Sequence, residues 1–356
     1  MRIPPVTGQY VGLGEGDVSL EIAKIKAHLK AKYTPARLTL DDGSVFTAAL
    51  TAEVKREQAI FLGDGRLKPS DNVIPGVINL AFKYACGYLK KEVLLPLCFT
   101  AEGHMSDMYV GPVAWRGERL QAENRAIWRP TGYVNNTIPF KTATGVNELA
   151  RRVGQTVQDD GIKFPAGTPF VIGGFSEGGL LISKFYRDWL APGKPLNWRL
   201  KDLRGVVAAG NAYREKGVVA EWIPDGPAPD RQGLSNERFV NTPTHLWKEV
   251  ARAGDLYTDN QSSGDTALFK TMCYLLIAEG SFSGGAAGFL ARVYDLLSPA
   301  DDLIPVAMAI FDGMRFVGNM SPHGIYDMNP ALDFFRRQLA GPPVIWPAEF
   351  RVVRDK

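Results

Sequence analysis

The pattern of apolar and polar positions divides the chain into a helical first part and a second part of another kind. In the first part, apolar side chains recur at helical spacing in three segments, near residues 22–29, 47–58 and 77–85. No stretch there alternates convincingly in the manner of a strand. The pattern therefore predicts a small all-helical domain over residues 1–90.

Beyond this part, short apolar runs that suit buried strands alternate with amphipathic helical segments. The strand candidates are 94–100, 169–172, 203–208 and 244–250, and the main helical segments are 142–158 and 180–190. Such alternation is typical of a mostly parallel sheet with helices on both faces. We therefore expect an α/β domain over residues 91–356.

Residues 262–318 interrupt this alternation. Three apolar stripes at helical spacing, which begin at Leu268, Phe289 and Val306, follow one another with no strand between them. We interpret this region as a helical insertion that lies over the sheet. Its stripes could line a groove for an acyl chain, or they could simply pack against the sheet.

Composition and charge exclude several classes of protein. The 356 residues are 45% hydrophobic and 22% charged, with a net charge of +3, which is typical of a globular protein. No run of basic residues exceeds two, so nucleic-acid binding is not expected. No stretch approaches the roughly 18 apolar residues of a transmembrane segment, and the start lacks the features of a secretory signal.

The sequence shows no signature of a metal or cofactor site. Cys86, Cys98 and Cys273 lack the spacing of metal ligands, and we expect buried thiols. The sequence holds no Cys/His cluster, no phosphate-binding loop and no dinucleotide fingerprint. We therefore expect neither a metal ion nor a cofactor.

A G-x-S-x-G pentapeptide gives the strongest chemical signal. Gly174-Phe175-Ser176-Glu177-Gly178 follows a strand candidate and precedes a helical segment. A sharp strand-to-helix turn strains the serine backbone, leaves no room for Cβ atoms at the flanking positions and exposes the hydroxyl at the sheet edge. The motif predicts an α/β-hydrolase in which Ser176 is the nucleophile and the Glu177 backbone N–H belongs to the oxyanion hole.

A serine nucleophile needs a base, and four histidines are available. His28 is expected at the surface, and His104, after the first strand, is expected to supply a backbone N–H to the oxyanion hole. The base follows the nucleophile along the chain in this fold. Of the two later histidines, His245 lies within a strand candidate and suits a core position. His323 lies on a loop, and we predict it as the base; the alternative is that it caps the next helix.

The acid of the triad is expected after a strand, between the nucleophile and the base. Asp255, in Ala253-Gly254-Asp255-Leu256-Tyr257, follows the 244–250 candidate and could fix the histidine tautomer. Asp259 and Asp265 are nearby alternatives. The competing role for Asp255 is an Asx turn after glycine.

Several segments together resemble the lysin B enzymes of mycobacteriophages, which are cutinase-like esterases. The resemblance extends from about residue 93 to residue 340. The similar segments are Trp128-Arg129-Pro130-Thr131-Gly132-Tyr133, Thr144-Gly145-Val146-Asn147-Glu148-Leu149, Gly174-Phe175-Ser176-Glu177-Gly178-Gly179, Gly210-Asn211-Ala212-Tyr213-Arg214-Glu215, Gly254-Asp255-Leu256-Tyr257 and His323-Gly324-Ile325-Tyr326. The chain departs from the family at Glu177, Gly179 and Ala212, where Gln, Ala and Pro are more usual. The helical insertion between the acid and histidine segments also fits lysin B.

The resemblance implies a serine esterase that hydrolyses the ester between mycolic acids and arabinogalactan, and so detaches the mycolate outer membrane during host lysis. Its substrate would be mycolyl-arabinogalactan-peptidoglycan. The protein would be made in the host cytoplasm without a signal peptide and act at the cell envelope, once other phage proteins have breached the inner membrane. Two other hypotheses are a broader lipase or cutinase and a non-catalytic wall-binding phage protein.

Residues 1–90 resemble, more loosely, the small helical peptidoglycan-binding domain found in some longer lysin B proteins. This likeness implies a tether that holds the esterase at the cell wall. The alternative is a packing cap on the hydrolase.

Overall fold

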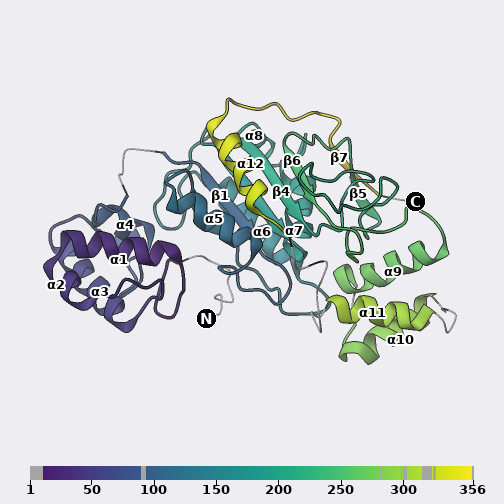
Figure 1. Ribbon diagram of the computed structural model, residues 1–356, viewed down its shortest axis with the longest axis horizontal. Helices are drawn as coiled ribbons and strands as arrows, with labels where there is room; N and C mark the ends of the chain where they lie inside the picture. The colour runs from purple at the N-terminus through teal and green to yellow at the C-terminus, as the bar shows by residue number, and fades with distance from the viewer. Residues whose placement is uncertain are drawn as a thin grey trace.

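The computed structural model describes residues 11–89, 94–280, 282–297, 299, 303–314, 323 and 326–354. At its centre lies a five-stranded sheet with the strand order β2-β1-β3-β4-β6 (Figure 1). All neighbouring strands in this sheet run parallel. The strands are β1 (Leu97–Ala101), β2 (Ile127–Pro130), β3 (Phe170–Phe175), β4 (Leu203–Ala209) and β6 (Trp247–Val250).

Helices cover both faces of this sheet, and alternate residues of each strand face opposite sides. Cys98, Val171 and Val207 share one apolar cluster with α5 (Pro112–Ala122) and α12 (Asn329–Ala340). Phe99 and Ile172 belong to the cluster on the other face, with α6 (Thr142–Gly154), α7 (Glu177–Phe185), the π-helical turn Tyr186–Leu190 and α8 (Asn197–Leu200). The expected α/β-hydrolase architecture is confirmed.

One strand of the main sheet and a separate pair of strands were not predicted from the sequence. β2 at the edge of the main sheet was not expected as a strand. A separate antiparallel pair joins β5 (Glu237–Val240) to β7 (Arg351–Arg354), which lie far apart in the sequence. Both omissions concern four-residue strands whose pairing is not local.

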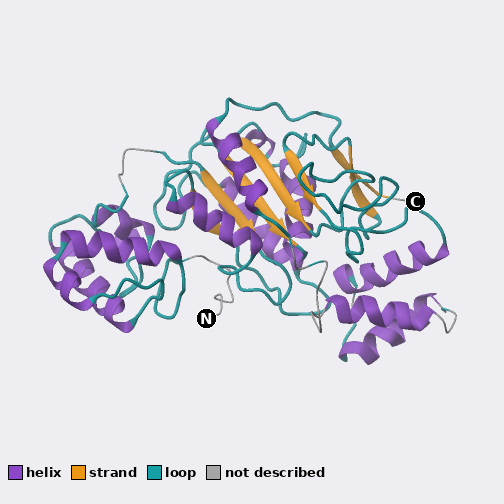
Figure 2. Cartoon of the chain, viewed as in Figure 1, coloured by secondary structure: helices purple, strands orange, loops and turns teal. Residues whose placement is uncertain are grey.

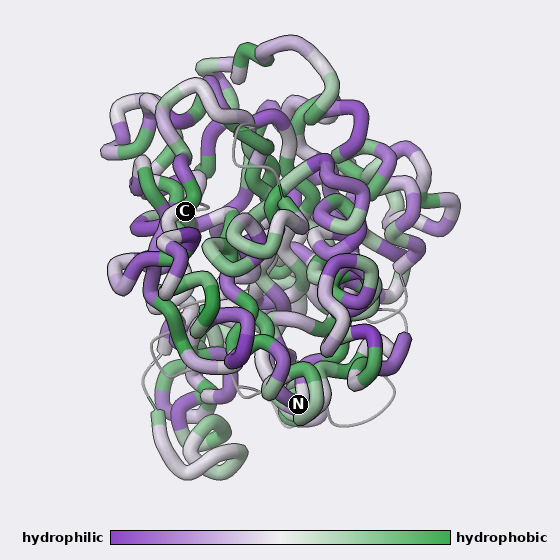
Figure 3. The backbone as a smooth tube through the Cα atoms, turned by 90° about the vertical axis from the view of Figure 1, so that its left-hand side faces the viewer, coloured by the Kyte–Doolittle hydropathy of each residue, from purple (hydrophilic) through white to green (hydrophobic). Residues whose placement is uncertain are grey.

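The N-terminal part is helical, as expected, with α1 (Leu20–Lys32), α3 (Ala48–Gly63) and α4 (Leu80–Ala85) in the predicted places. It adds α2 (Thr34–Thr39) and the short 3-10 turn Pro69–Asp71, which were not predicted. Its apolar faces enclose a core of their own that includes Ile22, Ile25, Leu29, Leu50, Val54, Phe61 and Phe82. Hydrophobic and hydrophilic positions interleave along the helices in Figure 3, as amphipathic elements require.

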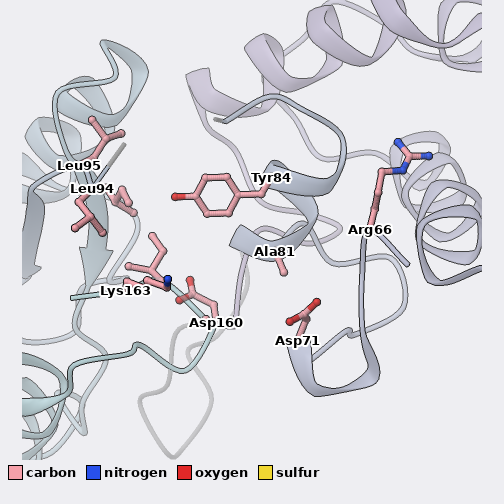
Figure 4. A pocket seen from close by; sticks show the side chains of 11 residues that line it. Arg66, Asp71, Ala81, Tyr84, Leu94, Leu95, Asp160 and Lys163 are labelled. Carbon is pink, nitrogen blue, oxygen red and sulfur yellow. The ribbon is translucent and has the colours of Figure 1, made fainter. Parts of the chain in front are cut away.

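The seam between this module and the hydrolase combines hydrogen bonds with apolar contact, because Leu80 of α4 belongs to the apolar cluster of the sheet. The Glu118 carboxylate on α5 accepts hydrogen bonds from Ser19 Oγ at 2.7 Å and from the Leu20 N–H at 2.5 Å, at the start of α1. Lys24 Nζ donates to the Ala122 carbonyl at 2.7 Å. Farther along, a cavity of about 370 Å³ separates Tyr84 of α4 from the hydrolase residues around Lys163 (Figure 4).

The predicted insertion forms three consecutive helices, α9 (Asp265–Glu279), α10 (Gly285–Leu297) and α11 (Ile304–Met314) (Figure 2). Residues 281, 298, 300–302 and 315–318 of the predicted range lie outside the described residues. The buried side chains of the insertion belong to the same apolar cluster as the sheet; among them are Phe269, Cys273, Ile277, Phe289, Val293, Ile310 and Phe311. In the part of the chain that the structure describes, no helix is both long and apolar enough to cross a membrane. All three cysteines are buried thiols.

Candidate active site

Ser176 lies at the turn between β3 and α7 in a strained backbone conformation. Its φ of 56° and ψ of −120° are unusual for a residue with a Cβ atom. A Cβ atom on Gly174 would lie 2.4 Å from the Gly178 carbonyl oxygen, and one on Gly178 would lie 2.0 Å from the Ala101 carbonyl oxygen. Only glycine fits at both positions, so the pentapeptide forms the sharp turn that the motif predicts.

The surroundings of Ser176 include both of the predicted oxyanion-hole segments. Glu177 is the first residue of α7, and the N–H groups of the first helical turn have no partner within the helix. Gly103 is also packed so closely that a Cβ atom there would lie 3.4 Å from Ser176 Oγ. The segment that follows β1 therefore lies against Ser176 at Gly103, and His104 is the next residue along the chain.

The imidazole of His323 lies against two aromatic rings, one of which belongs to the residue before Ser176. The imidazole stacks on Phe175 at a centroid distance of 5.2 Å and on Tyr257 at 4.3 Å. A Cβ atom on Gly210 would lie 2.4 Å from His323 Cε1, so glycine is needed there as well. Nε2 is buried and has no hydrogen-bond partner among the described residues. This nitrogen is therefore available to a reacting group.

Asp255 binds the other ring nitrogen of His323. Its Oδ1 lies 3.0 Å from His323 Nδ1 and accepts the Tyr257 N–H at 2.8 Å, while Oδ2 accepts the Tyr326 hydroxyl at 2.5 Å. Burial alone would raise the pKa of this fully buried carboxyl. The charge and hydrogen bond of His323, aided by Tyr326 and the Tyr257 amide, outweigh burial and lower the pKa of Asp255. An ionised Asp255 holds the proton of His323 on Nδ1 and leaves Nε2 as the acceptor.

The other acid candidates serve the local structure. Asp259 Oδ2 accepts the Gly254 N–H at 2.7 Å, and its Oδ1 lies 3.8 Å from Arg231 Nε. Asp265 is the first residue of α9. The structure therefore places Asp255, rather than Asp259 or Asp265, on the histidine.

The remaining histidines occupy different surroundings. The expectation that His245 belongs to the core is wrong, because β6 begins at Trp247 and His245 precedes it as an exposed residue. His28 is half-buried, with Nε2 3.1 Å from the Cys86 carbonyl oxygen. His104 is buried, and its Nδ1 lies 3.5 Å from Glu177 Oε2.

Several residues of the site were not assigned a role from the sequence. The Glu177 side chain accepts the Thr142 hydroxyl at 2.9 Å; burial raises the pKa of this carboxyl, against the opposing effect of His104. Tyr257 and Tyr326 lie in the segments that resemble lysin B, but only the fold shows that they contact the histidine and the acid. The only feature of the sequence that could have pointed to these two residues is their spacing, since one tyrosine follows Asp255 by two residues and the other follows His323 by three.

The helical insertion reaches the site through Phe140. The Phe140 N–H donates to the Ile277 carbonyl of α9 at 2.9 Å, and its ring lies 5.1 Å from the His104 ring. α9 is therefore linked to the turn beside Ser176. No group of three His, Cys, Asp or Glu side chains in the described ranges is arranged to hold a metal ion.

Comparisons with known proteins agree with this fold. No family model and no curated protein matches the sequence. Among solved structures, the chain is similar to lysin B from Mycobacteriophage D29, with 23% identity, a TM-score of 0.56, and coverage of 68% of this chain and 99% of that chain. At this identity the likeness establishes the α/β-hydrolase fold, and the activity has to be argued from the site.

A second similar structure is a cutinase-like protein from Cryptococcus sp. It shows 14% identity over 46% of this chain and 79% of that chain, with a TM-score of 0.32. That score is too low to support a conclusion.

Proposed function

We propose that this protein is a serine esterase in which Ser176 is the nucleophile, His323 the general base and acid, and Asp255 the group that orients the histidine. The observation that carries this proposal is the hydrogen bond that His323 Nδ1 donates to Asp255, which leaves Nε2 unpaired beside a strained serine turn. The order of the three residues along the chain is the one typical of α/β-hydrolases.

In the first half of the reaction, Ser176 Oγ attacks the acyl carbon and its proton passes to His323 Nε2. The electrons of the carbonyl double bond move to oxygen, where the N–H groups of Glu177 and of the turn at His104 stabilise the charge. The bond to the alcohol then breaks, and His323 returns the proton to the departing oxygen. Water repeats these steps on the acyl-enzyme and releases the acid.

The substrate that we propose is the mycolyl ester of arabinogalactan in the mycolyl-arabinogalactan-peptidoglycan of the host cell wall. Three observations support this choice: the fold shared with lysin B from Mycobacteriophage D29, the family-like segments around the triad, and an apolar insertion whose α9 is linked to the site. The enzyme would be made in the host cytoplasm and act at the envelope during lysis, with residues 1–90 bound to peptidoglycan.

Substitution of the triad tests the activity. Ser176→Ala and His323→Ala should each lower kcat for a soluble short-chain ester by several orders of magnitude, and Asp255→Asn should lower it somewhat less. A fluorophosphonate probe should label the native chain and leave Ser176→Ala unlabelled. An unlabelled native chain would contradict the proposal and favour a non-catalytic wall-binding protein.

Mass spectrometry of lipid released from purified mycolyl-arabinogalactan-peptidoglycan tests the substrate. We expect free mycolic acids from the native enzyme and none from Ser176→Ala. Equal or greater activity on triglycerides than on this material would favour a broader lipase or cutinase.

A further inference from the structure

The hydroxyl of Tyr257 is buried beside the nucleophile and is not satisfied by the resting protein. Tyr257 is only 4% exposed, and its hydroxyl has no hydrogen-bond partner among the described residues. The Ser176 side chain is close enough to perturb the phenol, but the two hydroxyl groups do not reach hydrogen-bond geometry. A buried polar atom without a partner reduces stability, so it calls for an explanation.

The backbone and ring of Tyr257 are fixed on several sides. Its N–H donates to Asp255 Oδ1 at 2.8 Å, and its carbonyl oxygen accepts the Leu234 N–H at 2.9 Å. Its ring stacks on the His323 imidazole at 4.3 Å with an interplanar angle of 25°. The acid and the base therefore position this tyrosine, and its hydroxyl is held near Ser176.

The phenol remains protonated while the enzyme works. Burial raises the pKa of Tyr257 well above its usual value, and the charges of Asp255 and Glu177 raise this pKa further, against the opposing effect of Ser176. At neutral pH the hydroxyl is therefore neutral and can donate a hydrogen bond.

We propose that Tyr257 is a catalytic residue whose hydroxyl donates a hydrogen bond to Ser176 Oγ when negative charge develops on that oxygen. The proposal rests on the proposed esterase function. Oγ gains alkoxide character as its proton moves to His323, and again when it leaves the acyl carbon during hydrolysis of the acyl-enzyme. A hydrogen bond to an oxygen strengthens with its negative charge, so the contact favours both transition states over the ground state. Tyr257 keeps its own proton throughout.

The substitution Tyr257→Phe separates this role from a packing role. It preserves the ring that stacks on His323 and removes only the hydroxyl. Tyr186→Phe is the matched control, because Tyr186 is also buried and its hydroxyl donates to the Phe350 carbonyl at 3.2 Å, outside the proposed catalytic machinery. Melting temperatures of both variants report whether the fold survives.

The test measures kcat and KM on a soluble short-chain ester, and the second-order rate of labelling by a fluorophosphonate probe. Tyr257→Phe should lower kcat and the labelling rate together by about 10- to 100-fold, below the loss for a principal oxyanion donor. KM and the pH of the acid limb of the rate profile should not change, because the Asp255–His323 pair is intact. Tyr186→Phe should match the native enzyme.

A labelling rate and a kcat within about threefold of the native values would overturn the inference. So would a loss confined to KM, or a loss accompanied by a fall in melting temperature that Tyr186→Phe does not show. Failure of the probe to label the native chain would instead contradict the proposed function itself.

Discussion

The described residues include two all-helical segments, and they differ in how far their buried side chains share the core of the sheet. The N-terminal module, α1–α4, encloses an apolar core of its own and meets the hydrolase through hydrogen bonds, a cavity and the side chain of Leu80. The insertion, α9–α11, contributes its buried side chains to the same core as the sheet. Similar amphipathic patterns in the sequence thus correspond to helices with a core of their own in one case and to helices that share the core of the sheet in the other.

The difference shows that helical periodicity indicates which face of a helix is buried and says nothing of what buries it. For the module the partner is local, since its helices lie within one continuous stretch of chain. The helices of the insertion pack on one another and on loops such as that of Phe140, and their buried side chains join the apolar cluster of the sheet.

The two segments should differ most in what their deletion does to the yield of soluble, active enzyme. Replacing residues 262–318 with a short flexible linker should abolish soluble, active enzyme, because it uncovers the core that the insertion shares with the sheet. Deleting residues 1–90 should leave kcat for a soluble short-chain ester nearly unchanged, and binding to cell-wall fragments in a pelleting assay should weaken. If the truncated enzyme is inactive on every substrate, the module is a packing cap instead of a tether.

One matched substitution in each core should give the next largest effect. Ile277 and Ile25 are both fully buried, one in the insertion and one in the module. Replacement of either by alanine should destabilise its own core by about 2–5 kcal/mol. Ile277→Ala should shorten the half-life of esterase activity on heating, whereas Ile25→Ala should leave that half-life unchanged. Equal effects on the half-life would show that the two segments unfold as one.

The pH dependence of stability should differ between the two parts. Burial raises the pKa of Glu102 in the hydrolase to about 8 and that of Glu249 to about 7, in both cases against opposing hydrogen bonds and arginine charges. A carboxyl whose pKa is raised on folding supports the fold below its unfolded pKa, and this support is lost as pH rises through the folded value. Hydrolase stability should therefore fall between about pH 5 and pH 8.

Glu102→Gln should reduce the fall in hydrolase melting temperature between pH 5 and pH 8 by several degrees, because the amide does not ionise. The fold should be kept, because the amide oxygen can still accept the Val113 and Ala114 N–H groups. Unfolding of the module serves as the internal reference in the same calorimetric scan. An unchanged pH profile in Glu102→Gln would show that Glu102 does not cause the fall.

The seam should give the smallest effect. Glu118→Ala removes the acceptor for Ser19 and Leu20 at the start of α1, and we expect a loss of about 1 kcal/mol or less. Hydrogen exchange of the α1 amides should speed up while ester hydrolysis stays the same. Lys30→Ala, which breaks an ion pair with Asp42 inside the module, is the control that leaves the seam intact.

Local signals explain what could be predicted from the sequence. The turn at Ser176 needs glycine at fixed offsets, so the motif and its neighbouring strand and helix were enough to recognise it. The choice of His323 followed from chain order, and that of Asp255 from its place after a strand. Both residues meet in the fold, while their catalytic roles stay a prediction.

Features that depend on distant contacts could not be recognised. β2 is only four residues long and contains Arg129 and Pro130, and its pairing with β1 is what makes it a strand. The apolar run predicted a strand over residues 244–250, but β6 begins only at Trp247. His245 was therefore expected in the core, although it lies before the strand. The stacking of Tyr257 on His323 joins segments on either side of the insertion, so no local pattern contained it.

The place of the insertion in the chain has a consequence for when activity begins. Asp255 and His323 are separated by 68 residues, and the insertion lies between them. At about 5–20 residues per second, a ribosome needs roughly 3–14 s to synthesise that interval. During this time the nascent chain would carry the proposed nucleophile and acid without the proposed base. If His323 is the base, hydrolysis can start only after it has emerged and stacked on Phe175 and Tyr257. The proposed mechanism thus ties the onset of activity to the completion of the shared core.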